Sequence, residues 1–255
     1  MLKRFVKSIY SVFEKAAEEK GYRTRWFPPQ FLKNPQAELQ LSLEFVLAHL
    51  MLAKKDIYFI QIGANDGMKD DPLQKFVKQY GWKGILVEPI PEAFEALKTN
   101  YGNNSDLKFI NAAIAEEDGV RTLYSFRRDT DFKGGTLYSS FRRDVLLRNA
   151  HWVPEAAQQV VEVPVPCLSM KSLLRETGGK AVDLLLIDTE GFDFNILKMI
   201  DFSALKPPVI AYEHAHLAKS DMVAATDLLL AQGYRLTRDN LDTIAYRPIT
   251  SYAAR

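Results

Sequence analysis

The 255-residue chain has a single cysteine, Cys167, and almost no net charge. One cysteine excludes intramolecular disulfides and thiolate metal clusters, and it fits a reducing compartment. The sequence also lacks the ~20 consecutive apolar residues that cross a bilayer and the apolar core of a secretory signal. A formal charge of +1 gives the protein no overall field that would hold nucleic acid through its phosphates, so nucleic acid is not an expected partner. We expect a cytoplasmic protein.

Glycine and proline are moderate in number, with thirteen and twelve residues, which excludes collagen-like and low-complexity chains. What the sequence does contain is typical of a globular protein, with 47% hydrophobic and 25% charged residues. Because one hydrophobic core can grow up to roughly 250–300 residues, one large α/β domain is the default.

Residues 1–55 favour helices. Apolar residues from Leu2 to Ala17 recur at helical spacing opposite a mostly basic face, and a second amphipathic pattern runs from Ala37 to Ala53. We predict an N-terminal helical extension over residues 1–55. Its first helix is expected to dock on its own domain or on a second copy in a homodimer. Weak peripheral contact of residues 2–17 with an anionic membrane is the alternative.

Residues 56–255 alternate short apolar runs with helical patterns, which is typical of a parallel sheet built from βαβ units. The expected strands are Ile57–Ile62, Gly84–Glu88, Leu107–Asn111, Val182–Asp188 and Val209–Glu213, followed by a closing antiparallel hairpin of Tyr234–Thr237 and Thr243–Tyr246. The expected helices are Asp71–Tyr80 with Asp71 as N-cap, Pro91–Asn100, Ser169–Glu176, Phe192–Ile200 and Asp221–Gln232. The predicted fold class is α/β, a doubly wound and mostly parallel sheet.

Residues 121–160 do not fit this alternation and are interpreted as an insertion over one edge of the sheet. The segment combines arginines with aromatic residues. The guanidinium groups of arginine bind phosphate or carboxylate, and the faces of aromatic rings stack on sugar rings or bases. We therefore expect Arg142 and Arg143 to bind a substrate, with a solvated surface hairpin held by its own ion pairs as the alternative.

A glycine loop, Gly63-Ala64-Asn65-Asp66-Gly67, follows the first expected strand, where ligands of open parallel sheets bind. Its spacing differs from the G-x-G-x-x-G of dinucleotide folds, and Asp66, Asp70 and Asp71 add negative charge that disfavours a phosphate. A ligand with a positive centre and no phosphates suits this loop better. Glu88, at the end of the second strand, is suited to accept hydrogen bonds from a ribose diol. The combination indicates S-adenosylmethionine.

Four segments of the chain together resemble the FkbM-type family of S-adenosylmethionine-dependent methyltransferases. They are Phe59–Gly67, Val87–Pro89, Asn111–Ile114 and Asp183–Gly191 with Leu197 after it. The resemblance implies a class I methyltransferase, Rossmann-like fold and methyl transfer to a hydroxyl oxygen, commonly of a sugar or a natural product. It also implies that Gly63, Asn65 and Gly67 lie at the methionine end of the cofactor, Glu88 at the ribose and Ala112 near the adenine. Family members usually carry a lysine where this chain has Leu186.

The full set of expected cofactor-binding residues is Gly63, Ala64, Asn65, Asp66, Gly67, Glu88, Ala112 and Asp188. Methyl transfer also needs a group that removes the proton of the acceptor hydroxyl, and titratable residues at the strand ends can do this. We predict catalytic roles for His214, Asp188 and Glu213, with His214 first because imidazole titrates near neutral pH.

Substrate-binding roles are predicted for Glu190, His216, Arg142 and Arg143. A loop histidine with its own hydrogen-bond partners and a carboxylate that caps the next helix are the structural alternatives for these positions. A divalent metal held by Asp188, Glu213 and His214 is not favoured but stays open.

The sequence therefore predicts an enzyme, an O-methyltransferase acting on a hydroxyl of a sugar, a glycan or a related natural product, as in polysaccharide biosynthesis. An RNA-hydroxyl methyltransferase and a non-catalytic binding module that retains the cofactor fold are the alternatives. Base methylation is disfavoured because Pro166-Cys167 precedes the fourth strand, whereas cytosine-C5 enzymes carry their Pro-Cys after it. We expect Cys167 to be a buried structural residue.

Overall fold

The structure is a computed structural model that describes residues 41–68, 71–126, 139–148, 150, 153, 155–239 and 241–247. The predicted first helix with its membrane contact, and residues 37–40 of the second, lie outside the described residues. Within the described ranges, no helix is both long and apolar enough to cross a membrane. The helices are α3 (Leu43–Ala53), α4 (Gln74–Tyr80), α5 (Pro91–Tyr101), α6 (Arg143–Arg148), α7 (Ala156–Gln159), α8 (Met170–Arg175), α9 (Asp193–Met199) and α10 (Lys219–Ala231).

The main sheet has seven strands in the order β10-β11-β9-β8-β1-β2-β3. Their bounds are β1 (Tyr58–Ile62), β2 (Lys83–Val87), β3 (Leu107–Ile110), β8 (Leu184–Ile187), β9 (Val209–Glu213), β10 (Arg235–Asp239) and β11 (Asp242–Tyr246). The first five of these pair in parallel, and β11 runs antiparallel to both β9 and β10. The predicted parallel strands and closing hairpin are confirmed, and so is the class I, Rossmann-like fold.

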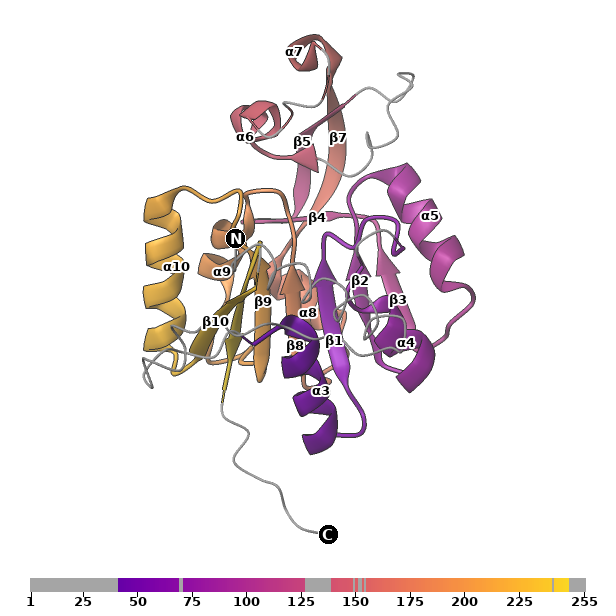
Figure 1. Ribbon diagram of the computed structural model, residues 1–255. Coiled ribbons are helices and arrows are strands. Elements are labelled where there is room, and N and C mark those ends of the chain that lie inside the picture. Colours follow the sequence, from indigo (N-terminus) through magenta and orange to yellow (C-terminus); the bar gives the residue numbers. More distant parts are fainter. Residues whose placement is uncertain are drawn as a thin grey trace, which may run out of the picture. The chain divides into compact units, whose positions relative to one another are not determined.

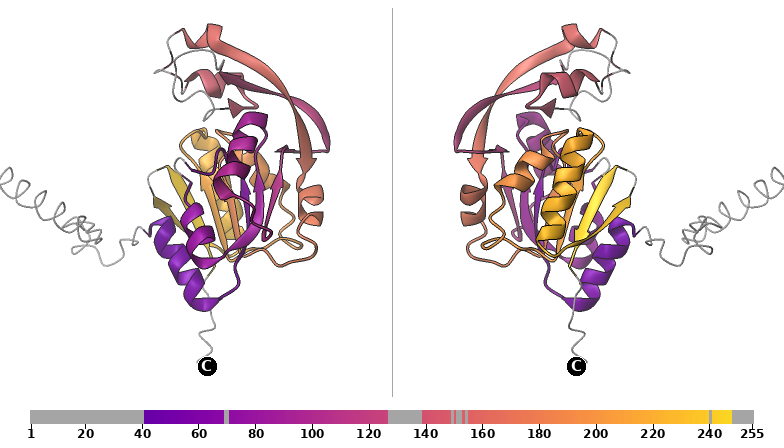
Figure 2. Two further views of the ribbon diagram at one scale, coloured as in Figure 1. Left: turned by 90° about the vertical axis from the view of Figure 1, so that its right-hand side faces the viewer. Right: turned by 90° about the vertical axis from the view of Figure 1, so that its left-hand side faces the viewer.

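Helices cover both faces of this sheet (Figure 2). On one face, Ile196 of α9 and Leu229 of α10 join a core cluster with Ile60. On the other face, Leu47 of α3 and Phe76 of α4 join a cluster with Phe59, the strand neighbour of Ile60. Every residue of β1 is buried, as expected for a strand covered on both sides.

Helix α3, which the sequence assigned to the N-terminal extension, packs on the main sheet and shares a core cluster with β1. Ser42 caps the helix by accepting a hydrogen bond from the Phe45 amide. Directly after the helix, the Lys54 ammonium lies 2.8 Å from both carboxylate oxygens of the buried Asp183. The amphipathic pattern predicted the helix, but the pattern alone does not say which surface its apolar face covers.

The predicted start of α4 is wrong. The helix begins at Gln74, and its N-cap position is Leu73 without a side-chain hydrogen bond. Instead of capping, the Asp71 carboxylate accepts hydrogen bonds from the Leu73 amide at 2.8 Å and from the Tyr101 hydroxyl at 2.6 Å. Two other predicted helix starts are confirmed, with Pro91 in the first turn of α5 and Ser169 capping α8.

A second sheet of four strands, in the order β4-β7-β5-β6, projects from one end of the main sheet together with α6 and α7 (Figure 1). Its strands are β4 (Ala113–Ala115), β5 (Gly119–Phe126), β6 (Ser139–Ser140) and β7 (Val160–Ser169). We call residues 113–126 and 139–169 the arm. The described part of the predicted insertion, residues 121–160, belongs to this arm, in which β5 and β7 pair antiparallel over the whole length of β5. Cys167 in β7 is 2% exposed, so its predicted burial is confirmed.

Candidate active site

A cavity of about 510 Å³ lies at the carboxyl ends of β1, β2, β8 and β9. This volume is within the usual range of small-molecule sites. The chain order reverses here, because β1 leads to β2 and β3 on one side while β8 and β9 lie on the other. Such a switch point is where open α/β sheets bind ligands, as the sequence predicted.

The loop after β1 forms one wall of the cavity. Gly63 has φ +81°, and a Cβ on it would lie 1.7 Å from the Asp188 carbonyl oxygen, so the close approach of the two strand ends requires glycine. Asn65 adopts the left-handed region at φ +47°, which is uncommon for a residue with a side chain. The Asn65 Oδ1 is buried without a hydrogen-bond partner. A buried acceptor of this kind in a cavity wall suits a ligand that brings an N–H donor.

Glu88 joins the end of β2 to this loop. Its side chain is buried, and its two carboxylate oxygens accept hydrogen bonds from the Asn65 amide at 2.8 Å and the Ile90 amide at 2.9 Å. Glu88 therefore holds Asn65 in its left-handed conformation while itself lining the cavity. Ala112, a small buried residue after β3, lines the same cavity.

The second half of the glycine loop has a different role. Neither Asp66 nor Gly67 is among the residues that line the cavity. A Cβ on Gly67 would lie 2.6 Å from atoms of Leu97 and Tyr101, so this glycine allows the loop to pack against α5. The Asp66 carboxylate accepts a hydrogen bond from the Met68 amide. The structure thus brings six of the eight predicted cofactor-binding residues to the cavity and leaves these two outside it.

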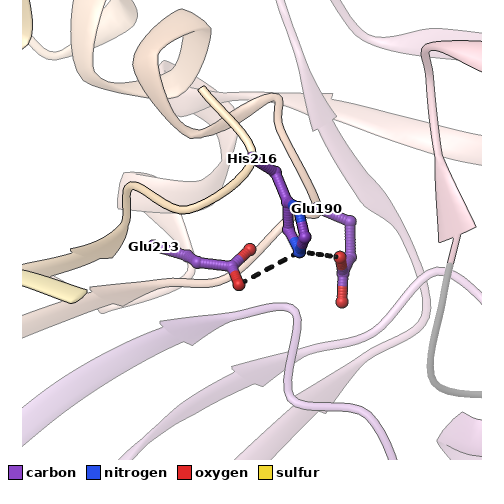
Figure 3. A group of neighbouring side chains, drawn as sticks. All are labelled: Glu190, Glu213 and His216. Carbon is purple, nitrogen blue, oxygen red and sulfur yellow. Dashed lines mark ion pairs between the residues drawn. The ribbon is translucent and has the colours of Figure 1, made fainter. Parts of the chain in front are cut away.

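Three side chains that line the cavity point toward one another, as Figure 3 shows. Glu190 follows β8, Glu213 ends β9 and His216 lies in the turn after β9; we call them the Glu–His cluster. The His216 Nε2 lies 3.0 Å from Glu190 Oε2 and 3.3 Å from Glu213 Oε1. The Glu213 Oε2 and His216 Nδ1 are buried without a hydrogen-bond partner.

Carboxylates are concentrated around this cluster. Burial, with Asp188 and Glu190 nearby, raises the pKa of Glu213 to about 10. The surrounding protein and the charge of Glu190 also raise the pKa of Asp188, which lines the cavity. The pKa of Asp242 is raised to about 6, again mainly by burial. The site therefore favours bound protons or a bound cation over several adjacent negative charges.

Three predicted site residues, His214, Arg142 and Arg143, do not line the cavity. His214 does not line the cavity; its Nδ1 lies 3.2 Å from Thr243 Oγ1, and burial lowers its pKa. Arg142 and Arg143 are exposed and do not line it either, with Arg142 paired to Asp144 at 2.8 Å. The cavity is lined by His216 instead.

The arm contributes lining residues that were not among the predicted site residues. Phe141 lines the cavity, its ring centroid lies 5.0 Å from that of Phe192, and the Arg121 guanidinium lies 4.6 Å from the Phe141 ring centroid. The Ser140 hydroxyl donates a hydrogen bond to the Glu190 carbonyl at 2.9 Å. The aromatic content of residues 121–160 was the available signal for Phe141. Outside the arm, Asp242 at the start of β11 also lines the cavity.

Comparison with known proteins gives one family match. A model described as the methyltransferase FkbM domain matches residues 61–236. No curated protein gives a significant match. Among solved structures, the chain is similar to methyltransferase FkbM from Methylobacillus flagellatus at 13% identity and a TM-score of 0.47, covering 75% of this chain and 44% of that one. The chain therefore spans less than half the length of that protein.

Two further structures are similar at a comparable level. Precorrin-6y C5,15-methyltransferase from Geobacter metallireducens is 11% identical with a TM-score of 0.40, covering 83% of this chain and 92% of that chain. A fibrillarin pre-rRNA processing protein from Methanococcus jannaschii is 11% identical with a TM-score of 0.41, covering 77% of this chain and 69% of that chain.

Proposed function

The chain belongs to the FkbM methyltransferase family, and on this premise we propose that it is an S-adenosylmethionine-dependent O-methyltransferase acting on a hydroxyl of a sugar, a glycan or a related natural product. One observation carries the proposal. A single cavity joins the glycine loop and Glu88 on one side with Asp188 and the Glu–His cluster on the other. A cofactor and an acceptor can therefore meet beside groups that bind protons.

The residues present fit S-adenosylmethionine, which carries an ammonium and a sulfonium but no phosphate. The buried Asn65 Oδ1 is an acceptor for the ammonium, and the Glu88 carboxylate at the end of β2 suits a ribose diol. The small, apolar Ala112 suits the adenine ring. When bound, the cofactor supplies an electrophilic methyl group. The surrounding carboxylates favour its positive charge.

Asp188 is the group that we propose receives the proton of the acceptor hydroxyl. Asp188 is exposed, whereas the other acidic residues that line the described cavity are buried or half-buried, so an acceptor can reach it. The cavity holds the acceptor oxygen in line with the transferred methyl carbon, at about 3 Å. Loss of the hydroxyl proton to Asp188 makes that oxygen a better nucleophile.

Titration calorimetry tests the cofactor half of the proposal. The protein is expected to bind S-adenosylmethionine and S-adenosylhomocysteine, whereas an empty scaffold would bind neither. Transfer of a labelled methyl group from S-adenosylmethionine to fractionated glycan and nucleic-acid extracts then identifies the acceptor. Label in the glycan fraction supports the proposal. Label confined to RNA, or no binding of either cofactor form, would contradict it.

Phe141 is expected to form part of the acceptor site, because it lines the cavity from the arm. Phe141→Ala should raise the acceptor KM about tenfold, which corresponds to the loss of one aromatic contact, and leave the affinity for S-adenosylhomocysteine unchanged. The matched comparison is the double variant Arg142→Ala, Arg143→Ala, since these exposed neighbours do not line the cavity. A larger KM effect in the double variant would instead assign acceptor binding to the arginines, as the sequence alone suggested.

A further inference from the structure

We propose that the Glu–His cluster binds one divalent cation and that this cation holds the acceptor hydroxyl. Cation binding depends only on the three side chains, whereas the role of the cation in methyl transfer rests on the proposed function. The ligand set differs from the one predicted from the sequence, because Glu190 and His216 take the places expected for Asp188 and His214 beside Glu213.

The first argument is geometric. Glu190, Glu213 and His216 each offer one ligand atom, and these atoms all lie within 4.8 Å of one another. The His216 Nε2 faces two carboxylate oxygens, at 3.0 and 3.3 Å. An imidazole nitrogen carries at most one hydrogen, so it can donate to only one of the two oxygens at a time. A cation between the three groups satisfies all of them, and ligands about 2.1 Å from a metal lie roughly 3 Å apart at right angles.

The second argument is burial. Glu213 is 7% exposed, and its Oε2 has no hydrogen-bond partner. A buried carboxylate oxygen without a partner is unfavourable unless a ligand supplies positive charge or a donor. In the described part of the chain, the ion pairs that Glu190 and Glu213 form are both with His216. One imidazole, even when protonated, supplies one positive charge for two carboxylates.

The cluster is also held in position before any ligand binds. The Ser140 hydroxyl of the arm donates a hydrogen bond to the Glu190 carbonyl at 2.9 Å. A Cβ on the next residue, Gly191, would lie 2.9 Å from Val145 of α6, so the arm packs closely against this loop. Fixed ligands reduce the ordering that binding requires, which favours affinity.

Two carboxylate oxygens and one imidazole nitrogen are ligands that Mg²⁺ and Mn²⁺ accept, and no thiolate is present among them. An octahedral ion with three protein ligands retains about three open positions. Two of these positions can bind neighbouring oxygens of an acceptor, such as a vicinal diol of a sugar. The cavity around the cluster is open to such a molecule.

The cation would lower the pKa of the bound hydroxyl without changing its own oxidation state. The hydroxyl proton passes to Asp188, and a lone pair of the acceptor oxygen forms the new O–C bond. The C–S bond of the sulfonium breaks with its electron pair remaining on sulfur, which gives the thioether. Charge and electrons therefore balance without any further reactant.

Mn²⁺ is the probe that tests the site directly. The 255-residue chain, freed of metal by chelation and without cofactor, is titrated with Mn²⁺. Binding is followed by electron paramagnetic resonance and calorimetry. We expect one bound Mn²⁺ per chain and at least a tenfold weaker affinity in both Glu213→Gln and His216→Gln. Asp144→Asn is the control, because Asp144 is an exposed carboxylate of the arm that pairs with Arg142. Thermal unfolding of each variant verifies that it is folded.

Absence of Mn²⁺ binding to the unmodified protein, or equal affinity in the folded variants, would overturn the site. Methyl transfer is then measured after exhaustive chelation and after Mn²⁺ is restored. Loss followed by recovery supports the role in acceptor binding, and full activity without metal would overturn that role. If Mn²⁺ binds as expected but no acceptor is methylated, the metal site stands and the proposed function fails.

Discussion

Asp188→Asn is expected to lower kcat for methyl transfer by about 10²–10⁴-fold, the usual contribution of a group that moves a proton in the transition state. Asp188 follows β8, the strand beside β1, and lines the cavity. An asparagine keeps the size and most of the hydrogen bonding of the aspartate. It cannot take up the hydroxyl proton, so the loss should fall on the chemical step.

Single-turnover kinetics with saturating acceptor measures this effect, and calorimetry with S-adenosylhomocysteine measures cofactor affinity separately. The affinity should stay within about threefold, or less than 1 kcal/mol. Asp242→Asn is the matched control, because Asp242 is another carboxylate of the same cavity on a different strand. If the cofactor affinity falls by the same factor as kcat, the role of Asp188 is to bind the cofactor and not to accept the proton of the acceptor hydroxyl.

Glu88→Ala should weaken the binding of S-adenosylhomocysteine about 100-fold, since a hydrogen bond to a charged group contributes about 1.5–3 kcal/mol. Two losses combine in this variant. The carboxylate proposed to bind the ribose is removed, and the Asn65 amide loses the acceptor that holds its left-handed backbone. The loop after β1 would then relax away from the conformation that lines the cavity.

Calorimetry separates these two losses when Glu88→Gln is included. The glutamine retains one side-chain oxygen that can accept from the Asn65 amide, so its affinity should lie between those of the alanine variant and the unmodified protein. Glu92→Ala, an exposed acidic residue in the first turn of α5, is the control for general charge effects. Unchanged affinity in Glu88→Ala, with the protein still folded, would remove Glu88 from the cofactor site.

Local patterns in the sequence predicted most of the strands and helices of the main sheet. β1 and β9 are short apolar runs bounded by turn residues, and Pro91 marks the start of α5. The arm was harder to predict because prolines interrupt β7, and prolines normally argue against a strand. The alternation of Val163, Val165 and Cys167 toward the interior with exposed Pro164 and Pro166 was the signal for it.

The Rossmann-like order, the glycine loop and the carboxylates at the strand ends could be predicted from the sequence, because these features depend on neighbours along the chain. Which histidine reaches the cavity could not, because it depends on a contact between distant segments. His214 and Ala215 both donate their amides to the Leu241 carbonyl in the β10–β11 turn, a contact distant in sequence. That contact sets the direction of the turn after β9, so His216 meets Glu190 and Glu213 while His214 faces Thr243.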